Sequence, residues 1–356
     1  MADTGKKQKT MKIPIILSIV LSISIIFLIL IFTFDASTFD YLSSVSLRYE
    51  FFAAAVLLNI LTWVIWGLRL KVLCNSIDKK VHMDMWKSTK IVIANLFLAG
   101  ITPSMAGGEP VRIHLLNKNG LSLGSATASV LGERLIDALF ILTCVPFAFF
   151  IIRGRIDIGF IQIGLLIGVV FFIVVVFLLA YAIKNPKKTK SFLIYINNKL
   201  SRFSKKEKKK GSKIINRINT EVDNFHNSMV FFLSEGKKAF IFAGVITVLY
   251  WSTGFMIPSM LLLGLGLPPF FIESYAAQVL LLVIIMIPTT PGSSGMTELG
   301  VGGLYTVLIG SSLIGVFVLL FRIITYHMNL IVGAFFQYKI FKSVASFSLD
   351  TIKKKK

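Results

Sequence analysis

The sequence predicts an all-α integral membrane protein with about six full transmembrane helices and two re-entrant helical hairpins, arranged as an inverted repeat. The chain has 356 residues, of which 55% are hydrophobic and only 15% are charged. Several apolar runs reach the roughly 20 residues that cross a bilayer as a helix. Two shorter apolar runs are broken by Pro/Gly loops, which hydrocarbon tolerates only where protein or a water-filled cavity surrounds them.

The N-terminal membrane half covers residues 1–183. Four lysines precede residue 13, whereas residues 35–50 carry three acids and one arginine, so the N-terminus is predicted to be cytoplasmic. The full spans of this half are predicted at residues 13–32, 51–70, 126–152 and 160–183. Residues 91–116 form a re-entrant hairpin in this scheme, because the run 91–101 is only about half a bilayer long at helical rise.

A basic segment, residues 184–238, separates the two halves and holds 15 Lys/Arg against 4 Asp/Glu. Its apolar residues recur at spacings of three and four, which is typical of an amphipathic helix. They are Ile214, Ile218, Val222, Phe225, Met229 and Phe232. The apolar face suits either the membrane surface or the bundle, and a solvated linker with one helix fits the pattern equally well.

The C-terminal membrane half covers residues 239–341, with predicted spans at 239–263 and 313–340 and a second re-entrant hairpin at 272–309. The basic tail, residues 342–356, is predicted to be cytoplasmic. This half therefore repeats the unit of span, hairpin and span in the opposite orientation. The repeat extends to charged residues: Arg134 follows Glu109 by 25 residues, and Arg322 follows Glu298 by 24.

The two broken loops, residues 102–112 and 288–298, predict the functional site. Interrupted segments at corresponding places in two halves are the best sequence indication of a central transport site. Charged residues inside the spans are expensive in hydrocarbon and mark pairs, cavities or function. The candidate site residues are Glu109, Arg112, Glu133, Arg134, Asp137, Glu298 and Arg322.

Structural explanations stay open for these residues. Glu109 and Glu298 could serve only as helix caps, since an acid complements the positive end of a helix dipole. Arg134 could pair with Glu133 or Asp137. Arg322 could pair in the same way with Glu298. A functional interpretation also stays open for Arg112 and His114, which could meet a phosphate at the cytoplasmic mouth.

Three short motifs carry a family resemblance. They are PSMAGGEPVR at 103–112, GERLID at 132–137 and PGSSGMTE at 291–298. In these motifs and in hydropathy the chain resembles the transmembrane-region family of lysylphosphatidylglycerol synthase, the flippase half of the bacterial multiple peptide resistance factor. The resemblance implies a translocase that moves a polar-headed lipid between leaflets. After residue 340 only a short basic tail remains, so we expect a stand-alone membrane domain without the aminoacyl-transfer domain of full-length members.

The favoured function is therefore a lipid translocase for a polar-headed or polyprenyl-linked lipid, and not an enzyme. A membrane glycosyltransferase and a non-transporting accessory protein of envelope synthesis are the alternatives. A weaker one is an intramembrane serine protease, since Gly292 to Gly295 reads Gly-x-Ser-Gly and His327 follows. No ATP-binding phosphate loop is present in the sequence, which therefore does not support ATP coupling within this chain.

The net charge of +21 predicts anionic membrane lipids, not nucleic acid, as partners, because the basic residues cluster in predicted loops and tails. Cys74 and Cys144 are the only cysteines, which supports neither a disulfide framework nor a cysteine zinc site, and no cofactor is expected. We expect a multi-pass protein of the cell membrane with both termini in the cytoplasm. A homo-oligomer is compatible with the sequence.

Overall fold

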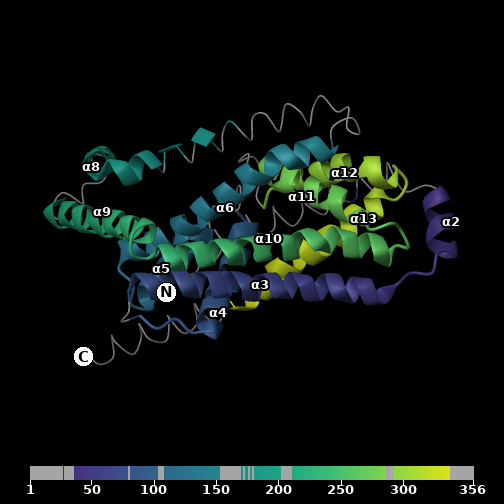
Figure 1. The fold of residues 1–356 in the computed structure, drawn as a ribbon, viewed down its shortest axis with the longest axis horizontal. Helices are drawn as coiled ribbons and strands as arrows, with labels where there is room; N and C mark the ends of the chain where they lie inside the picture. The colour runs from purple at the N-terminus through teal and green to yellow at the C-terminus, as the bar shows by residue number, and fades with distance from the viewer. Residues whose placement is uncertain are drawn as a thin grey trace, which may run out of the picture.

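The computed structural model describes residues 36–78, 81–102, 108–152, 180–201, 211–285 and 292–336, with a few single positions besides. Throughout this part of the chain every regular element is helical, which confirms the predicted all-α class. Figure 1 shows an elongated bundle whose longest helices run along the long axis of the molecule.

Four described helices are long and apolar enough to cross a membrane. They are α3 (Tyr49–Ile77), α6 (Leu123–Ile152), α10 (Lys237–Gly264) and a helix at Ile314–Phe336 that begins as α13 (Ile314–Arg322). These helices confirm four of the predicted spans, with α3 extending seven residues beyond the expected end at residue 70. All but one residue of the predicted span 13–32 and most of the predicted span 160–183 lie outside the described residues, so the count of six stays a prediction.

Each predicted hairpin is a pair of packed short helices. The first pair is α4 (Met85–Gly100) with α5 (Gly108–Lys118), and the second is α11 (Phe271–Ile285) with α12 (Met296–Ile309). Their lengths of 16, 11, 15 and 14 residues fall short of the roughly 20 needed to span hydrocarbon. The side chain of Asp84 accepts the backbone N–H of Lys87 at 2.7 Å, which fixes the start of α4.

The two halves interlock. Helices α3 and α10 pack along each other at the centre, as Figure 1 shows. The first helix of each hairpin packs against a span from the other half. Helix α11 lies on α6, and α4 meets the last span through Phe97, Ile101, Tyr326 and Leu330. The halves therefore form one packed body in the described part of the chain.

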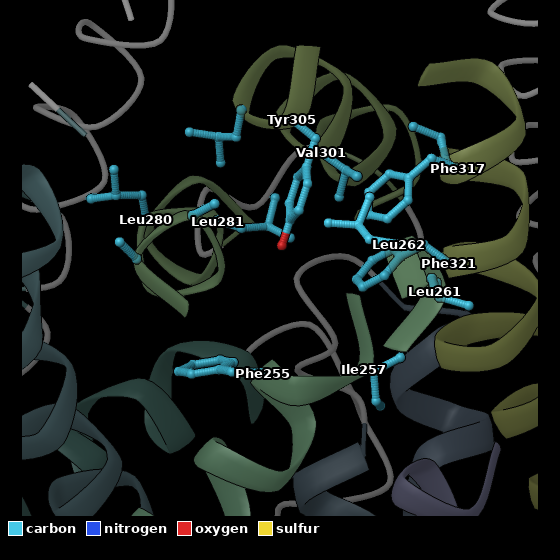
Figure 2. Close-up of a cluster of buried hydrophobic side chains, with 14 of the residues drawn as sticks. Phe255, Ile257, Leu261, Leu262, Leu280, Leu281, Val301, Tyr305, Phe317 and Phe321 are labelled. Atoms are coloured by element: carbon cyan, nitrogen blue, oxygen red, sulfur yellow. The ribbon is translucent and has the colours of Figure 1, made fainter. Parts of the chain in front are cut away.

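A large apolar cluster joins α10, α11, α12 and α13 (Figure 2). Leu261, Tyr305 and Phe317 lie in it with 0% of their surface exposed. The Tyr305 hydroxyl lies 2.7 Å from Ser274 Oγ and accepts from Gln278 Nε2 at 3.1 Å, so its polar end is satisfied. Because lipid tails are as apolar as these side chains, close packing, not transfer from water, holds such helices together.

The basic segment folds into α8 (Pro186–Ser201) and α9 (Gly211–Leu233) at one end of the bundle, away from α2 (Ala36–Ser44) (Figure 1). The apolar face of α9 packs on α6, where Met229 and Phe232 are buried. Glu221 of α9 accepts the backbone N–H of Gly124 at 2.7 Å and so caps α6. The sequence left open whether this helix lies on the membrane surface, against the bundle or in a solvated linker, and the structure places α9 against the bundle.

The last span contains a π-helical turn, η2 (Ile323–His327), directly after Arg322. Asn59 of α3 donates to the carbonyl oxygen of Ile324 at 2.9 Å and to Asn329 Oδ1 at 3.0 Å. The first of these bonds therefore reaches a backbone carbonyl oxygen inside the π-helical turn. Such turns inside α-helices are frequent at functional sites.

Candidate functional site

The first ionic centre forms where α3, α5, α6 and α10 meet. Glu133 and Asp137 of α6 lie four residues apart and therefore face the same side of the helix. Both are buried inside the bundle, with 0% and 4% of their surface exposed. Two buried carboxylates in an apolar setting require cationic or hydrogen-bond partners.

Arg69 of α3 supplies the first of these partners. Its Nη1 donates to Asp137 Oδ1 at 2.6 Å and to Thr247 Oγ1 at 2.9 Å. Its Nε donates to Glu133 Oε1 at 3.4 Å. One arginine therefore ties both carboxylates of α6 to helices α3 and α10.

Arg112 of α5 supplies the second partner, because its Nη2 donates to Glu133 Oε2. Its guanidinium lies 5.0 Å from the centroid of the Trp66 ring, within cation–π range. The side chain has 0% exposure, and its Nε and Nη1 have no hydrogen-bond partner among the described residues. The structure separates the two residues that the sequence placed together at the cytoplasmic mouth, since Arg112 turns into the bundle and His114 is exposed.

The third pair of this centre is partly exposed. Arg134 Nε donates to Glu109 Oε1 at 2.7 Å, and Arg134 Nη1 donates to Asp137 Oδ2 at 3.3 Å. The side chains of Arg134 and Glu109 are 40% and 23% exposed. The predicted pairing of Arg134 with Asp137 is present, but Glu133 pairs with the two other arginines instead.

Indole and phenol rings line the centre. Trp66 Nε1 donates to Glu133 Oε2 at 3.3 Å, and Trp251 Nε1 donates to Asp137 Oδ1 at 3.0 Å. The Tyr250 ring lies 5.2 Å from the guanidinium of Arg69. The centre thus combines three arginines with three carboxylates, so the formal charges balance, and neutral donors occupy further carboxylate positions.

The second ionic centre lies in the C-terminal half. Arg322 Nε lies 3.0 Å from Glu298 Oε1, and Arg322 Nη2 donates to Ser294 Oγ at 3.1 Å. Glu298 Oε2 also accepts the backbone N–H of Gly295 at 2.6 Å, so the predicted helix cap is present together with the ion pair. The Arg322 guanidinium stacks over the Tyr326 ring at 3.9 Å. Both charged side chains are sealed, with 2% and 0% exposure.

The two motif loops touch through the backbone. Gly292 N–H donates to the carbonyl oxygen of Thr102 at 3.0 Å, and the Tyr326 hydroxyl donates to the carbonyl oxygen of Gly100 at 3.0 Å. A Cβ at Gly292 would overlap the Gly100 carbonyl oxygen, and the φ of +61° at Gly292 also favours glycine. Residues 103–107, 286–289 and 291 lie outside the described part, so the ends of the loops themselves are not described.

The structure thus brings the seven candidate residues into two groups, five in the first centre and two in the second. Sequence reasoning missed Arg69, Thr247 and the two tryptophans Trp66 and Trp251. Arg69 stands one helical turn after Trp66 at the end of an apolar run, a pattern typical of the membrane interface. The helix α3 continues to Ile77, so Arg69 lies inside the helix and faces α6.

Comparisons with known proteins agree with this architecture. A family model described as the lysylphosphatidylglycerol synthase TM region matches residues 15–333. A UPF0104 membrane protein of Archaeoglobus fulgidus is 32% identical over 293 residues, which is 81% of this chain and 86% of that protein. A second, from Methanocaldococcus jannaschii, is 28% identical over 299 residues, covering 80% of this chain and 83% of its own. A third, from Pyrococcus horikoshii, is 24% identical over 315 residues, which is 84% of this chain and 90% of that protein.

No solved structure matches the chain. The family match covers most of the chain and includes all seven candidate site residues. The similarity to the Archaeoglobus fulgidus protein independently extends over most of both chains. The chain therefore belongs to the family of the lysylphosphatidylglycerol synthase TM region, as a multi-pass membrane protein.

Proposed function

We propose that the protein is a lipid translocase that moves a polar-headed or polyprenyl-linked lipid between membrane leaflets. The first ionic centre carries this proposal, because it combines buried charges in a membrane bundle with one pair that a ligand can reach. A single charge at the centre of a bilayer costs on the order of 3 kcal/mol on insertion scales. The family membership supports a lipid-related role in the membrane.

The exposed pair and the free donors suggest how a headgroup is held. Glu109 and Arg134 present a carboxylate and a guanidinium at a partly open position. Arg112 has two donor nitrogens without a hydrogen-bond partner in the described chain. Carboxylate oxygens suit an amine or hydroxyls, whereas the arginines suit an anionic group. The lipid tails remain in the bilayer in this proposal, while the headgroup exchanges with the ionic partners.

The second centre provides a second headgroup-binding station in the proposed transport cycle, where each station is one Glu–Arg pair. Glu298 and Arg322 repeat the chemistry of Glu109 and Arg134 at nearly the same sequence spacing. Each hairpin begins with a helix that packs on a span of the other half, which supports the proposed inverted repeat. Rocking of one half against the other would expose the two pairs alternately, as transporters built from inverted repeats do.

The contacts of Ser294 weigh against the protease alternative. Ser294 Oγ accepts from Arg322, and His327 Nδ1 lies 3.1 Å from the backbone carbonyl oxygen of Arg322. A serine nucleophile needs a base within hydrogen-bond reach, whereas a guanidinium is no base. Both residues are thus engaged with Arg322 in the structure.

The glycosyltransferase alternative requires acids in the outer loops. Among the described candidates, Glu50 pairs with Arg48 at 3.1 Å and is largely exposed. Asp40 is also exposed. The accessory-protein alternative requires only that the ionic centres stabilise the bundle. Measurable lipid transport would count against this alternative, and its absence would favour it.

The test of the function is leaflet exchange. The purified full chain is reconstituted into liposomes with fluorescent lipids of anionic, zwitterionic and polyprenyl-phosphate type, and outer-leaflet fluorescence is quenched with dithionite. We expect faster exchange of at least one lipid class than in protein-free liposomes. Exchange rates equal to those of protein-free liposomes for every lipid class would contradict translocation. A new glycosylated lipid in the extracts would favour the glycosyltransferase.

In the proposed orientation the protein lies in the cell membrane with both termini in the cytoplasm. Helix α2 meets the end of α10, where Tyr41 donates to the Leu265 carbonyl oxygen at 3.0 Å, and α9 lies at the opposite end. A cysteine at Ser44 or Pro269 should therefore react with an impermeant maleimide in intact cells. A cysteine at Lys209 should react only after permeabilisation, and reaction of Lys209→Cys in intact cells would reverse the scheme.

A further inference from the structure

A cavity of about 410 Å³ lies between α6, α8 and α9, and none of the residues of the two ionic centres lines it. Its size falls within the roughly 300–1,000 Å³ of small-molecule pockets. Side chains from all three helices line it, among them Leu131, Leu193 and Ile218. The translocase proposal makes no use of this cavity.

The walls of the cavity are apolar in spite of the polar residues in them. The Thr127 hydroxyl donates to the Leu123 carbonyl oxygen at 2.8 Å, and the Thr189 hydroxyl donates to the Asn185 carbonyl oxygen at 3.1 Å. The Glu221 carboxylate is occupied by the N–H of Gly124. The polar groups are thus satisfied by backbone, and a ligand meets methyl and methylene groups. Such a lining selects a hydrocarbon ligand, not a polar one.

The basic residues near the cavity favour an anionic headgroup at the polar end of that ligand. Lys184 and Lys187 are exposed and stand two residues from Ala182 and Thr189, which line the cavity. Lys190 is already paired with Asp223 at 2.7 Å. The segment 184–238 as a whole carries 15 Lys/Arg against 4 Asp/Glu. An anionic headgroup beside the cavity would find two lysines that pair with no carboxylate of the described residues.

We infer that this cavity binds one acyl chain of an anionic phospholipid, whose headgroup lies against Lys184 and Lys187. Bound there, the lipid would join α9 to the first turns of α6, the helix that also carries the carboxylates of the first ionic centre. None of the residues that line the cavity belongs to either ionic centre, and the inference does not depend on translocation. It would make the position of α6 sensitive to the anionic lipid content of the membrane.

Photolabelling of the full chain in vesicles tests this inference. The probe is phosphatidylglycerol with a diazirine in its acyl chain, and mass spectrometry maps the labelled peptides. We expect label in peptides from α6, α8 and α9 around the cavity. Thr127→Trp, which fills the cavity, should reduce this label to background. Thr143→Trp is the matched control, since Thr143 is an exposed residue of the same helix.

Leu193→Trp fills the cavity from the opposite wall and decides the question if Thr127→Trp fails to fold. Lys184→Gln and Lys187→Gln should each weaken labelling by about fivefold at low salt, whereas Lys238→Gln should not. A phosphatidylcholine probe with the same acyl chain should label weakly. Undiminished labelling in a folded filled variant, or equal labelling by the two probes, would overturn the inference.

Discussion

The two halves of the molecule hold the same pair of charges in different surroundings. Glu109 and Arg134 in the first half are partly exposed and belong to a network with two further arginines. Glu298 and Arg322 in the second half are sealed, with a serine and an aromatic ring as their neighbours. The same sequence spacing therefore accompanies a Glu–Arg pair in each half, whereas the packing around each pair leaves only the first one accessible.

In the proposed cycle the comparison has a direct meaning. The structure has one of two equivalent stations open and the other closed, and the backbone contact between the motif loops lies beside the closed one. Rocking of the halves would break this contact and exchange the exposures. The following experiments contradict or sharpen the comparison, from the largest expected effect to the smallest.

Carboxyl labelling should separate the two glutamates most clearly. A water-soluble carbodiimide with an amine nucleophile should modify Glu109 and leave Glu298 unmodified, because only Glu109 has an accessible carboxylate. Glu50, which is largely exposed, serves as the positive control. Peptide mass spectrometry measures the extents. Equal modification of Glu109 and Glu298 would show that both stations are open together.

Loss of Arg69 should be the largest stability effect. Arg69→Ala leaves Glu133 and Asp137 short of a partner inside the bundle, and breaking a buried ion pair costs about 3–5 kcal/mol. Arg48→Ala is the control, because an exposed pair of this kind contributes about 0–1 kcal/mol. Thermal unfolding in detergent, followed by helical circular dichroism, should show a large decrease for the first variant only.

Gly292→Ala should weaken the contact between the halves. An alanine in the left-handed region costs about 1–2 kcal/mol, and its Cβ would displace the Gly100 carbonyl oxygen. Gly302→Ala is the matched control, since a Cβ there meets open space in the middle of α12. If Gly292→Ala unfolds at the same temperature as Gly302→Ala, the close approach of the two loops is wrong.

Ser294→Ala should have the smallest effect on lipid exchange. It removes one hydrogen bond to Arg322 but leaves the ion pair with Glu298 in place. Exchange in liposomes should stay near the parent rate. Loss of exchange in this variant would show that the bond between Ser294 and Arg322 is needed for lipid movement. Cleavage of a membrane-protein substrate by the parent protein that disappears in Ser294→Ala would favour the protease alternative.

Much of the fold could be predicted from the sequence because charge-free apolar runs have few alternatives in a membrane protein. Four of the spans and both helical hairpins lie close to their expected places. The pairing of Arg322 with Glu298 follows from their position in neighbouring helices. In contrast, the position of α9 could not be predicted, since the same apolar face suits lipid and bundle equally well.

The role of Arg69 was also beyond the sequence. Its partners lie 64 to 178 residues away along the chain, on helices α6 and α10, and no local spacing links them. The same holds for the indole donors Trp66 and Trp251. These contacts depend on which helices meet, and that is decided by packing over the whole bundle.

The central claim is that the two motif glutamates act in lipid movement, and paired charge-removing variants test it most directly. Glu109→Gln and Glu298→Gln keep the size and hydrogen-bonding capacity of each side chain and remove its charge. Size-exclusion profiles and helical content should match the parent protein, which controls for folding. We expect both variants to exchange lipid much more slowly than the parent protein in the dithionite assay. Exchange at the parent rate in both would leave the glutamates as helix caps and ion-pair partners, and would contradict the central-site account.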